Sequence, residues 1–473
     1  MRTHYPSIIF LLLVSFTSFG NTAKPRDKML ADSTIVIIND ILIGGNKKTI
    51  KKVILRELMF EKGDTVYQEN LIELIKISRQ NLLNTSLFNY VTINIIDEND
   101  IYKSIFILVE ERWYLWPNLI FEHADRNLSA FLHEKDWSKV NYGFSVTKFN
   151  FRGRREKLKM KFRLGYKEQF QIQYENPMLF NLKRHGMSYE FSWYRQNETS
   201  VINNEDKQIY YKEEGSYVLK YYTTGLSYKY RHEYFYKHGL SLNYTFASVN
   251  DSIISLNNNY FGNKVNTTQF MTLIYDFDID KRNYRHYPLN GYKFEIQAKQ
   301  NGLGLLKNEM ESVWEFRAEH TQFFDLSNRW YSGLGGVIRL SSNKKQAYFI
   351  ESGLGYNDYL RAYEYYVING QNYFTARSFI KYEIIPTQIK EIGFFSWEKF
   401  NKIHYALYAN IFFDSGYITS IDESVNSRFS NQFLMSTGIG IDLVAYYDQI
   451  LRFEYSINRE FEHGFFLHIG MAF

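Results

Sequence analysis

The chain has 473 residues, of which 18% are aromatic, 23% are charged and only 6 are Pro, a composition that excludes a disordered chain and a helical repeat protein. It has no Cys, which excludes a disulfide framework, a thiolate metal site and a cysteine nucleophile. The 56 basic and 51 acidic residues leave a net charge of +5, too small a surplus to indicate a nucleic-acid partner.

Residues 1–20 have the features of an export signal. The basic residue Arg2 precedes the apolar run 8–16, and the small residues Ser18 and Gly20 suit a cleavage site. The run is shorter than the ~20 residues that a spanning helix needs, and no later stretch is as long or as free of charge. If the exported chain is a membrane protein, the sequence therefore predicts a β-barrel.

Residues 34–112 are predicted to form a small α/β unit with the element order β-α-α-β-β. Apolar residues alternate in three segments and recur with helical spacing in two others. The expected segments are strand 35–43, helices 48–58 and 68–83, and strands 91–95 and 105–109.

From residue 113 to residue 473, apolar and polar residues alternate with a period of two, and no helix is evident. A soluble sandwich would also alternate, but its strands are typically about 5–6 residues long. These segments are about ten residues long and rich in Tyr, Phe and Trp, which is typical of transmembrane barrels. In one segment the alternation places a row of cations on the polar face, namely Lys157, Lys159, Lys161 and Arg163.

A single β-α-α-β-β unit ahead of a long barrel resembles the Omp85 superfamily, in which periplasmic POTRA domains precede an outer-membrane barrel. The segment Leu360-Arg361-Ala362-Tyr363 is similar to the motif of the family's barrel-filling loop, although Ala362 stands where the family usually has Gly. The terminal Phe473 matches the recognition signal of assembled barrels in general.

This resemblance implies an all-β transmembrane barrel of about 16 antiparallel strands over residues 113–473. One POTRA domain would precede it at residues 34–112. The expected location is the outer membrane of a Gram-negative-type bacterium, with the POTRA domain in the periplasm.

The side-chain alternation also suggests a lock for the loop. It places Glu383 on the lumen side of segment 377–385 and Asp414 on the lumen side of segment 403–414. A carboxylate away from bulk water needs a cation, and Arg361 has a planar donor fork. We expect the loop to fold into the lumen, with Arg361 binding Glu383 and Asp414. The alternative is that all three are solvated groups in a wet channel.

The first barrel strand, at 113–121, must meet the last, at 464–473, and this seam is predicted to be the weakest pairing. Pro117 cannot donate to a ladder of hydrogen bonds, and Gly464 and Gly470 weaken a strand interior. The alternative places Pro117 in the linker below the barrel. A parted seam would leave backbone groups unpaired in lipid, at several kcal/mol each, and would template an incoming strand.

The implied function is the insertion or translocation of client proteins. The POTRA domain would capture extended segments by β-augmentation, and the barrel would open at the seam. The expected partners are outer-membrane lipid and unfolded clients or periplasmic chaperones, with accessory lipoproteins as further candidates. The alternative is a passive channel with a preference for anions, which the cationic row would provide.

We expect no cofactor, no metal site and no enzymatic activity. The sequence carries no nucleophile elbow, phosphate loop or dinucleotide fingerprint. The clustered histidines His232 and His238 lack the spacing of zinc hydrolases.

Overall fold

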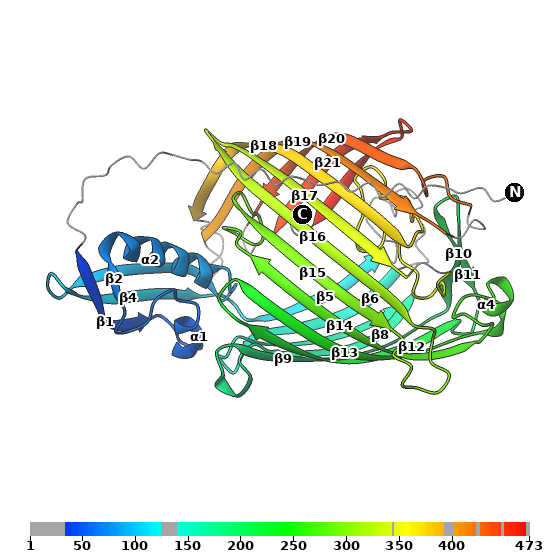
Figure 1. Cartoon of the computed structure of the whole chain (residues 1–473), viewed down its shortest axis with the longest axis horizontal. Coiled ribbons are helices and arrows are strands. Elements are labelled where there is room, and N and C mark those ends of the chain that lie inside the picture. Colours follow the sequence, from blue (N-terminus) through cyan, green and yellow to red (C-terminus); the bar gives the residue numbers. More distant parts are fainter. Residues whose placement is uncertain are drawn as a thin grey trace, which may run out of the picture.

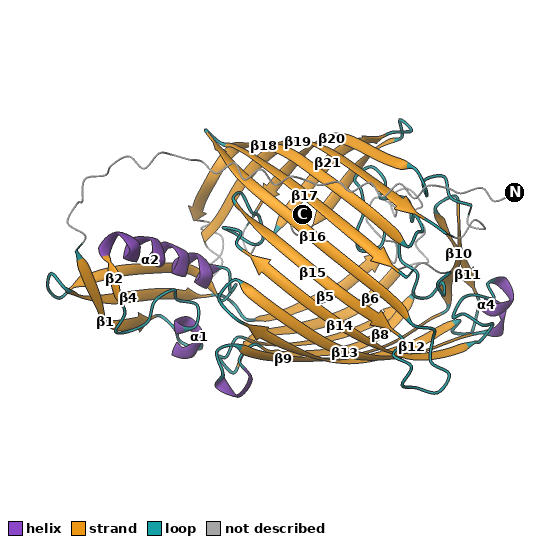
Figure 2. Cartoon of the chain, viewed as in Figure 1, coloured by secondary structure: helices purple, strands orange, loops and turns teal. Residues whose placement is uncertain are grey.

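The computed structural model describes residues 34–123, 140–342, 345–391, 402–421, 426–445 and 449–469. A small α/β domain lies at one end of a large, curved antiparallel sheet (Figure 1). Strands make up most of the structure, and the helices are short or belong to the small domain (Figure 2). The predicted export signal and the terminal Phe473 lie outside the described residues.

Among the helices of the described chain, none combines the length and the apolar character that crossing a bilayer requires.

The small domain contains a four-stranded sheet in the order β2-β1-β4-β3. Its second helix has the bounds that the apolar spacing predicted, whereas β2 was not predicted because three residues are too few to show a period. Its elements are β1 (Ile35–Gly44), α1 (Lys51–Leu55), β2 (Thr65–Tyr67), α2 (Gln68–Leu83), β3 (Phe88–Asp97) and β4 (Tyr102–Glu111).

The core of the small domain forms because one face of the sheet and one face of each helix are apolar. Alternate side chains of β1 and β4 point toward the helices, and each fully buried aliphatic side chain contributes about 1.5–3 kcal/mol. The fully buried members include Val36, Ile38, Ile54, Leu71, Leu82, Ile105 and Ile107.

The large sheet has sixteen strands, each hydrogen-bonded to its neighbours in chain order and antiparallel to them. This architecture confirms the predicted all-β barrel fold of antiparallel strands. The strands are β5 (Leu115–His123), β6 (Val140–Phe151), β7 (Glu156–Gly165), β8 (Lys167–Asn176), β9 (His185–Gln196), β12 (Leu219–Arg231), β13 (Tyr236–Val249), β14 (Thr267–Asp280), β15 (Gly291–Asn301), β16 (Val313–Ser327), β17 (Trp330–Ser341), β18 (Asn372–Glu391), β19 (Lys402–Thr419), β20 (Phe433–Val444), β21 (Ile450–Asn458) and β22 (His463–Ile469).

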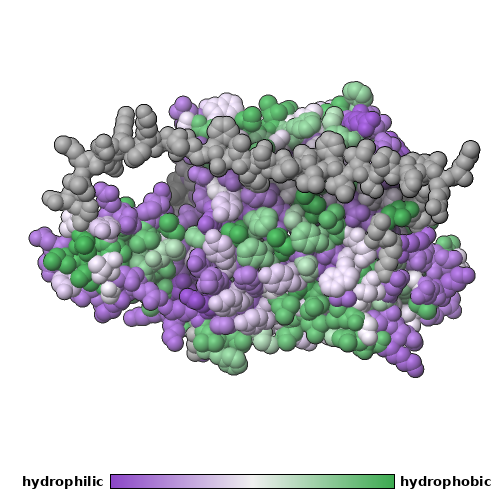
Figure 3. Space-filling model, viewed as in Figure 1, coloured by the Kyte–Doolittle hydropathy of each residue, from purple (hydrophilic) through white to green (hydrophobic). Residues whose placement is uncertain are grey.

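The two faces of this sheet differ in polarity, as the period of two requires. The outer face carries apolar side chains, including a row of neighbouring rings from β6 to β9 formed by Phe144, Phe162, Phe170 and Phe191. The inner face carries charges of both signs, and many are paired, as Lys299 is with Glu315. Apolar residues gather over the middle of the strands and hydrophilic residues toward the two ends (Figure 3).

Two features at the end opposite the small domain were not predicted (Figure 1). Strands β10 (Glu198–Asn204) and β11 (Lys207–Lys212) form a separate hairpin, and α4 (Asp251–Leu256) is a helix in a region where none was expected. The helix has only six residues, too few to establish a 3.6-residue period in the sequence. It is held by tertiary packing, since Ile253 is fully buried in an apolar cluster.

The small domain is joined to the rim of the large sheet by a buried carboxylate. Glu57, just after α1, accepts hydrogen bonds from Arg155 at 3.0 Å and from Arg231 at 3.1 and 3.2 Å. Arg56 lies 3.5 Å from the same carboxylate. Gly153 of the β6–β7 turn packs so closely that an added Cβ would lie 2.1 Å from the carbonyl oxygen of Lys48.

The environment of Glu57 strongly favours its ionised form. Burial by itself would raise the pKa of this carboxyl group, but the guanidinium groups of Arg155, Arg231 and Arg56 outweigh burial and lower the pKa to about 2. Burial has the opposite consequence for Arg56, whose pKa falls to about 10 because its charge is desolvated and crowded by two other cations. The junction therefore depends on a negative charge at Glu57.

Lowering the pH is expected to weaken this junction. Because the pKa of Glu57 falls from 4.5 to about 2 in the folded chain, its stabilisation is complete above about pH 5 and is lost as the pH falls toward 2. The full shift corresponds to on the order of 3 kcal/mol.

At pH 7.5, Glu57→Gln should accelerate hydrogen exchange in the turn 150–156. The exposed Glu69→Gln is the control, and equal exchange in both variants would contradict the expectation.

Candidate functional site: the inner loop and the edge strands

The loop 345–371, between β17 and β18, lies against the inner face of the large sheet. Asp358 accepts two hydrogen bonds from the guanidinium of Arg317 on β16, at 2.9 and 2.7 Å. The hydroxyl of Tyr363 donates to the backbone carbonyl of Met435 on β20 at 3.2 Å. Contacts to strands four apart in the sheet order show that the loop enters the space that the sheet encloses.

The predicted loop motif is buried at the centre of these contacts. Leu360 and Tyr363 belong to one apolar cluster with Phe429 and Leu434. Ala362 has a φ of 67°, in the left-handed region that costs an L-residue roughly 1–2 kcal/mol. The backbone at this position thus has the conformation that a Gly would adopt without strain, although the chain carries Ala there.

Arg361 makes a two-pronged ion pair with Asp414 of β19. The Nε atom lies 2.7 Å from Oδ2, and Nη2 lies 2.5 Å from Oδ1. Both side chains are buried, and the guanidinium carbon lies 3.7 Å from the ring centroid of Phe412. The planar fork and the ring face explain why Arg suits this position better than Lys.

The structure separates Glu383 from this pair. In the register of β18 and β19, Arg377 lies opposite Asp414 and Glu383 lies opposite Tyr408, so the two carboxylates are six positions apart along the strand. At about 3.3 Å per residue this is roughly 20 Å. Glu383 accepts a hydrogen bond from the Tyr408 hydroxyl at 3.0 Å.

The second carboxylate beside Arg361 is Glu454 of β21, whose Oε1 lies 3.4 Å from Nη1. The expectation that Arg361 binds both Glu383 and Asp414 is therefore corrected for Glu383. Side-chain alternation assigns a residue to the inner face but leaves its height along the strand undefined. Glu454 was missed because its contact with Arg361 depends on the curvature that brings β21 toward β19.

A second buried ion group lies close by, on β18, β20 and β21. Asp442 of β20 is within 3.0 Å of Lys381 on β18 and 3.0 Å of Arg452 on β21. It also accepts a hydrogen bond from the Tyr287 hydroxyl at 2.8 Å. Asp442 is fully buried, and a buried charge of this kind requires such partners. Lys381 lies two residues before Glu383 on β18 and so shares its inward side, whereas the contact with Asp442 depends on how the strands align.

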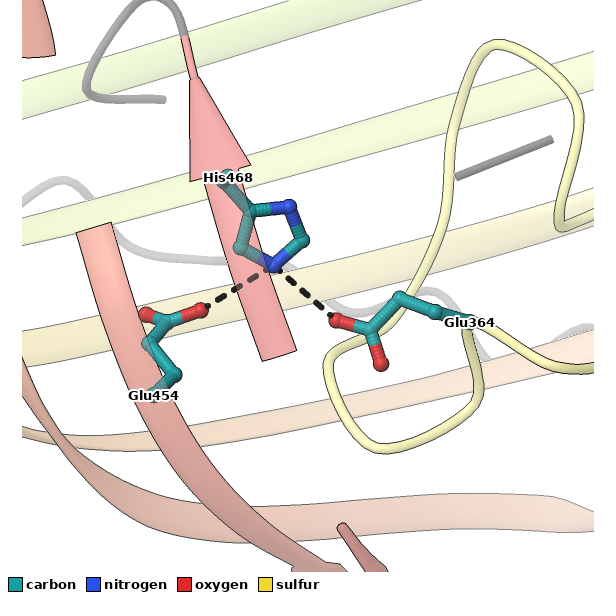
Figure 4. Close-up of side chains that lie close together, drawn as sticks. All are labelled: Glu364, Glu454 and His468. Atoms are coloured by element: carbon teal, nitrogen blue, oxygen red, sulfur yellow. Dashed lines mark ion pairs between the residues drawn. The ribbon is translucent and has the colours of Figure 1, made fainter. Parts of the chain in front are cut away.

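The loop also contacts the last two strands through His468 of β22 (Figure 4). The Nε2 atom of His468 lies 3.5 Å from Glu364 of the loop and 3.4 Å from Glu454 of β21. Sequence analysis did not identify this group because its members are separated by up to about a hundred positions in the chain. The available signal was that His468 falls on the inward-facing side of the last segment.

Two of the predicted seam residues, Pro117 and Gly464, lie on the two edge strands of the sheet. Within the described residues β5 pairs with β6 and β22 pairs with β21, and no pairing joins β5 to β22. Pro117 lies within β5, opposite Val146, rather than in a preceding linker. Gly464 lies in β22 opposite Ser456, whereas Gly470 falls outside the described part of the chain.

Apolar side chains on both edge strands are unusually exposed. Leu119 and Phe121 of β5 are 92% and 76% exposed, and Phe465 of β22 is 79% exposed. Such a surface is unfavourable in water and is compatible with lipid or with a covering strand. Among the described residues, the two edges therefore combine backbone groups that no neighbouring strand pairs with an apolar outer face.

Comparisons with known proteins agree with this architecture. The family profile described as "Omp85 superfamily domain" matches residues 150–464, and a POTRA profile described as "Surface antigen variable number repeat" matches residues 36–112. No protein with a curated description matches the chain.

Solved structures show the same fold at low sequence identity. BamA from Haemophilus ducreyi lacking POTRA domains 1–3 is 13% identical, with a TM-score of 0.51 over 92% of this chain and 83% of that chain. CdiB from Escherichia coli is 10% identical, with a TM-score of 0.57 over 93% of this chain and 76% of that chain.

Replacing Arg361 by Ala should destabilise the loop by about 3–5 kcal/mol, because Asp414 and Glu454 would remain buried without this cation. Arg361→Lys should fall between Ala and the parent, since it keeps the charge but loses the fork. Thermal unfolding in detergent and the rate of proteolysis within 345–371 measure the effect. Arg459→Ala, at an exposed turn, is the control, and the expectation fails if both Ala variants unfold alike.

Proposed function

The chain belongs to the Omp85 superfamily, as its motifs predicted, and on that premise we propose that this outer-membrane protein inserts or translocates client proteins. The proposed route is an opening between β5 and β22. The observation that carries the proposal is that these strands are the two edges of the sixteen-stranded sheet and are not paired with each other in the described residues. Backbone groups left unpaired in lipid cost several kcal/mol each, so an incoming strand is stabilised by pairing with them.

The composition of the edge strands supports opening at this position. Pro117 lies in a non-hydrogen-bonded pair with Val146, so its missing N–H group is lost on the free edge of β5, where a partner strand across the seam would otherwise accept from it. Gly464 contributes no side chain to the packing of β22. The exposed apolar side chains near both edges would be covered by lipid when the seam is open and by a client strand during insertion.

The small domain offers a second edge for extended segments. In the order β2-β1-β4-β3, the ten-residue strand β3 lies at one edge of the sheet. Residues 94–97 of β3 are exposed, so this half of the strand is accessible. We propose that a client segment pairs here by main-chain hydrogen bonds, which bind with little preference for sequence.

The charges of the inner face, which include both signs and several ion pairs, argue against the passive channel with a preference for anions. Lys157 lies opposite Glu175, and Lys159 and Lys161 lie opposite glutamines of β8, while ion pairs such as Arg317–Glu319 are distributed over other strands. The loop with Arg361 also occupies part of the interior. A large, steady and anion-selective current through the parent protein in planar bilayers would nevertheless support the passive channel.

The proposal is tested by closing the seam covalently. The chain has no Cys, so Leu119→Cys with Phe465→Cys introduces one defined pair across the edges, to be bridged by a bismaleimide. Bridging should abolish function, measured as restoration of the outer-membrane proteome in depleted cells. The control is Tyr455→Cys with Phe465→Cys, which joins residues already opposite each other on β21 and β22. A bridged seam that restores the proteome as well as the control would refute lateral opening.

A further inference from the structure

Three side chains of metal-ligand type converge where the loop meets the last two strands. Glu364 comes from the loop, Glu454 from β21 and His468 from β22, and they point toward one another (Figure 4). One ligand atom from each lies within 4.8 Å of those of the other two. Both carboxylates are buried, and His468 is partly buried.

The two distances from His468 fit the edges of a coordination polyhedron, and the carboxylate oxygens of the two glutamates lie within 4.8 Å of each other. The Nε2 atom of His468 lies 3.5 Å from Oε1 of Glu364 and 3.4 Å from Oε2 of Glu454. A tetrahedral ion with bonds of about 2.0–2.2 Å separates its ligands by roughly 3.3–3.6 Å. A direct charge-assisted N–H···O bond would be shorter, at about 2.7–2.9 Å.

The charges that surround the group are compatible with a further cation between Glu364 and Glu454. Arg361 and Arg452 approach Glu454 on its other oxygen, at 3.4 and 3.8 Å, and each also pairs with an aspartate, Asp414 or Asp442. His468 of β22 contacts Glu364. An imidazole that binds a metal ion is uncharged, so His468 would then add no positive charge of its own. Two carboxylates drawn together away from bulk water are stabilised by positive charge between them.

We propose that Glu364, Glu454 and His468 bind one divalent transition-metal ion, with Zn²⁺ preferred. An imidazole nitrogen with two carboxylate oxygens suits Zn²⁺, whereas Mg²⁺ and Ca²⁺ prefer sites built from oxygen alone. Because the ligands come from three elements, the ion pins the loop to the last two strands. Binding of the ion does not depend on the proposed function. Only an effect of the ion on the opening of the seam would rest on that function.

Direct titration of the full chain in detergent tests the site. After dialysis against EDTA, calorimetry with ZnCl₂ should show one saturable site per chain at pH 7.5, and MgCl₂ or CaCl₂ at the same concentration should show none. If the folded parent takes up no Zn²⁺, the three residues form a direct histidine–carboxylate ion pair and the proposal is overturned. This outcome is independent of whether client insertion is found.

Variants assign the binding to these residues. His468→Gln and Glu364→Gln should each weaken Zn²⁺ binding at least tenfold, and Zn²⁺ should no longer raise their melting temperature. His463→Gln is the matched control, because His463 is an exposed histidine at the start of the same strand. Binding by His468→Gln as tight as that of His463→Gln would place the ion elsewhere and would also overturn the proposal.

Discussion

The buried ion pair between Arg361 and Asp414 is the interaction on which the interior of this protein depends. Removing two charges from water costs several kcal/mol per ion, and only close, directional contacts compensate for that cost. Here both prongs of the guanidinium meet the carboxylate, and its flat face lies on Phe412. The pair holds the loop at one height on β19, and the contacts of the loop with β16, β20 and β22 act together with it.

The same loop makes the two sides of the seam unequal. It approaches β21 through Arg361 and Glu454 and β22 through Glu364 and His468. On the other side, β5 contains Pro117 and pairs only with β6 among the described strands. A strand contacted by the inner loop and a strand that contains a Pro thus form the two edges of one sheet.

The rim that carries the small domain follows a similar electrostatic principle. Glu57 is buried among three guanidinium groups, one from the β6–β7 turn and one from the end of β12. Contact between the small domain and the large sheet therefore pairs charges that neither part could keep buried without a partner. The small domain, which carries the accessible edge of β3, is therefore held in a defined position at the rim of the large sheet.

The sequence by itself determined the two domain types, the long period-two strands, the inward side of the strands that carry Glu383 and Asp414, and the bounds of α2, because these follow from local periodicity. It also indicated the loop motif and the pairing of Arg361 with an aspartate from the inner face. Only the tertiary structure decided that Glu454 rather than Glu383 joins Arg361, and that Glu364 and His468 meet. Those contacts depend on strand register and on the curvature of the sheet, which place residues at the same height only after distant segments have packed. The tertiary structure also decided the short elements β2 and α4, since they are stabilised by packing and are too brief to show a period.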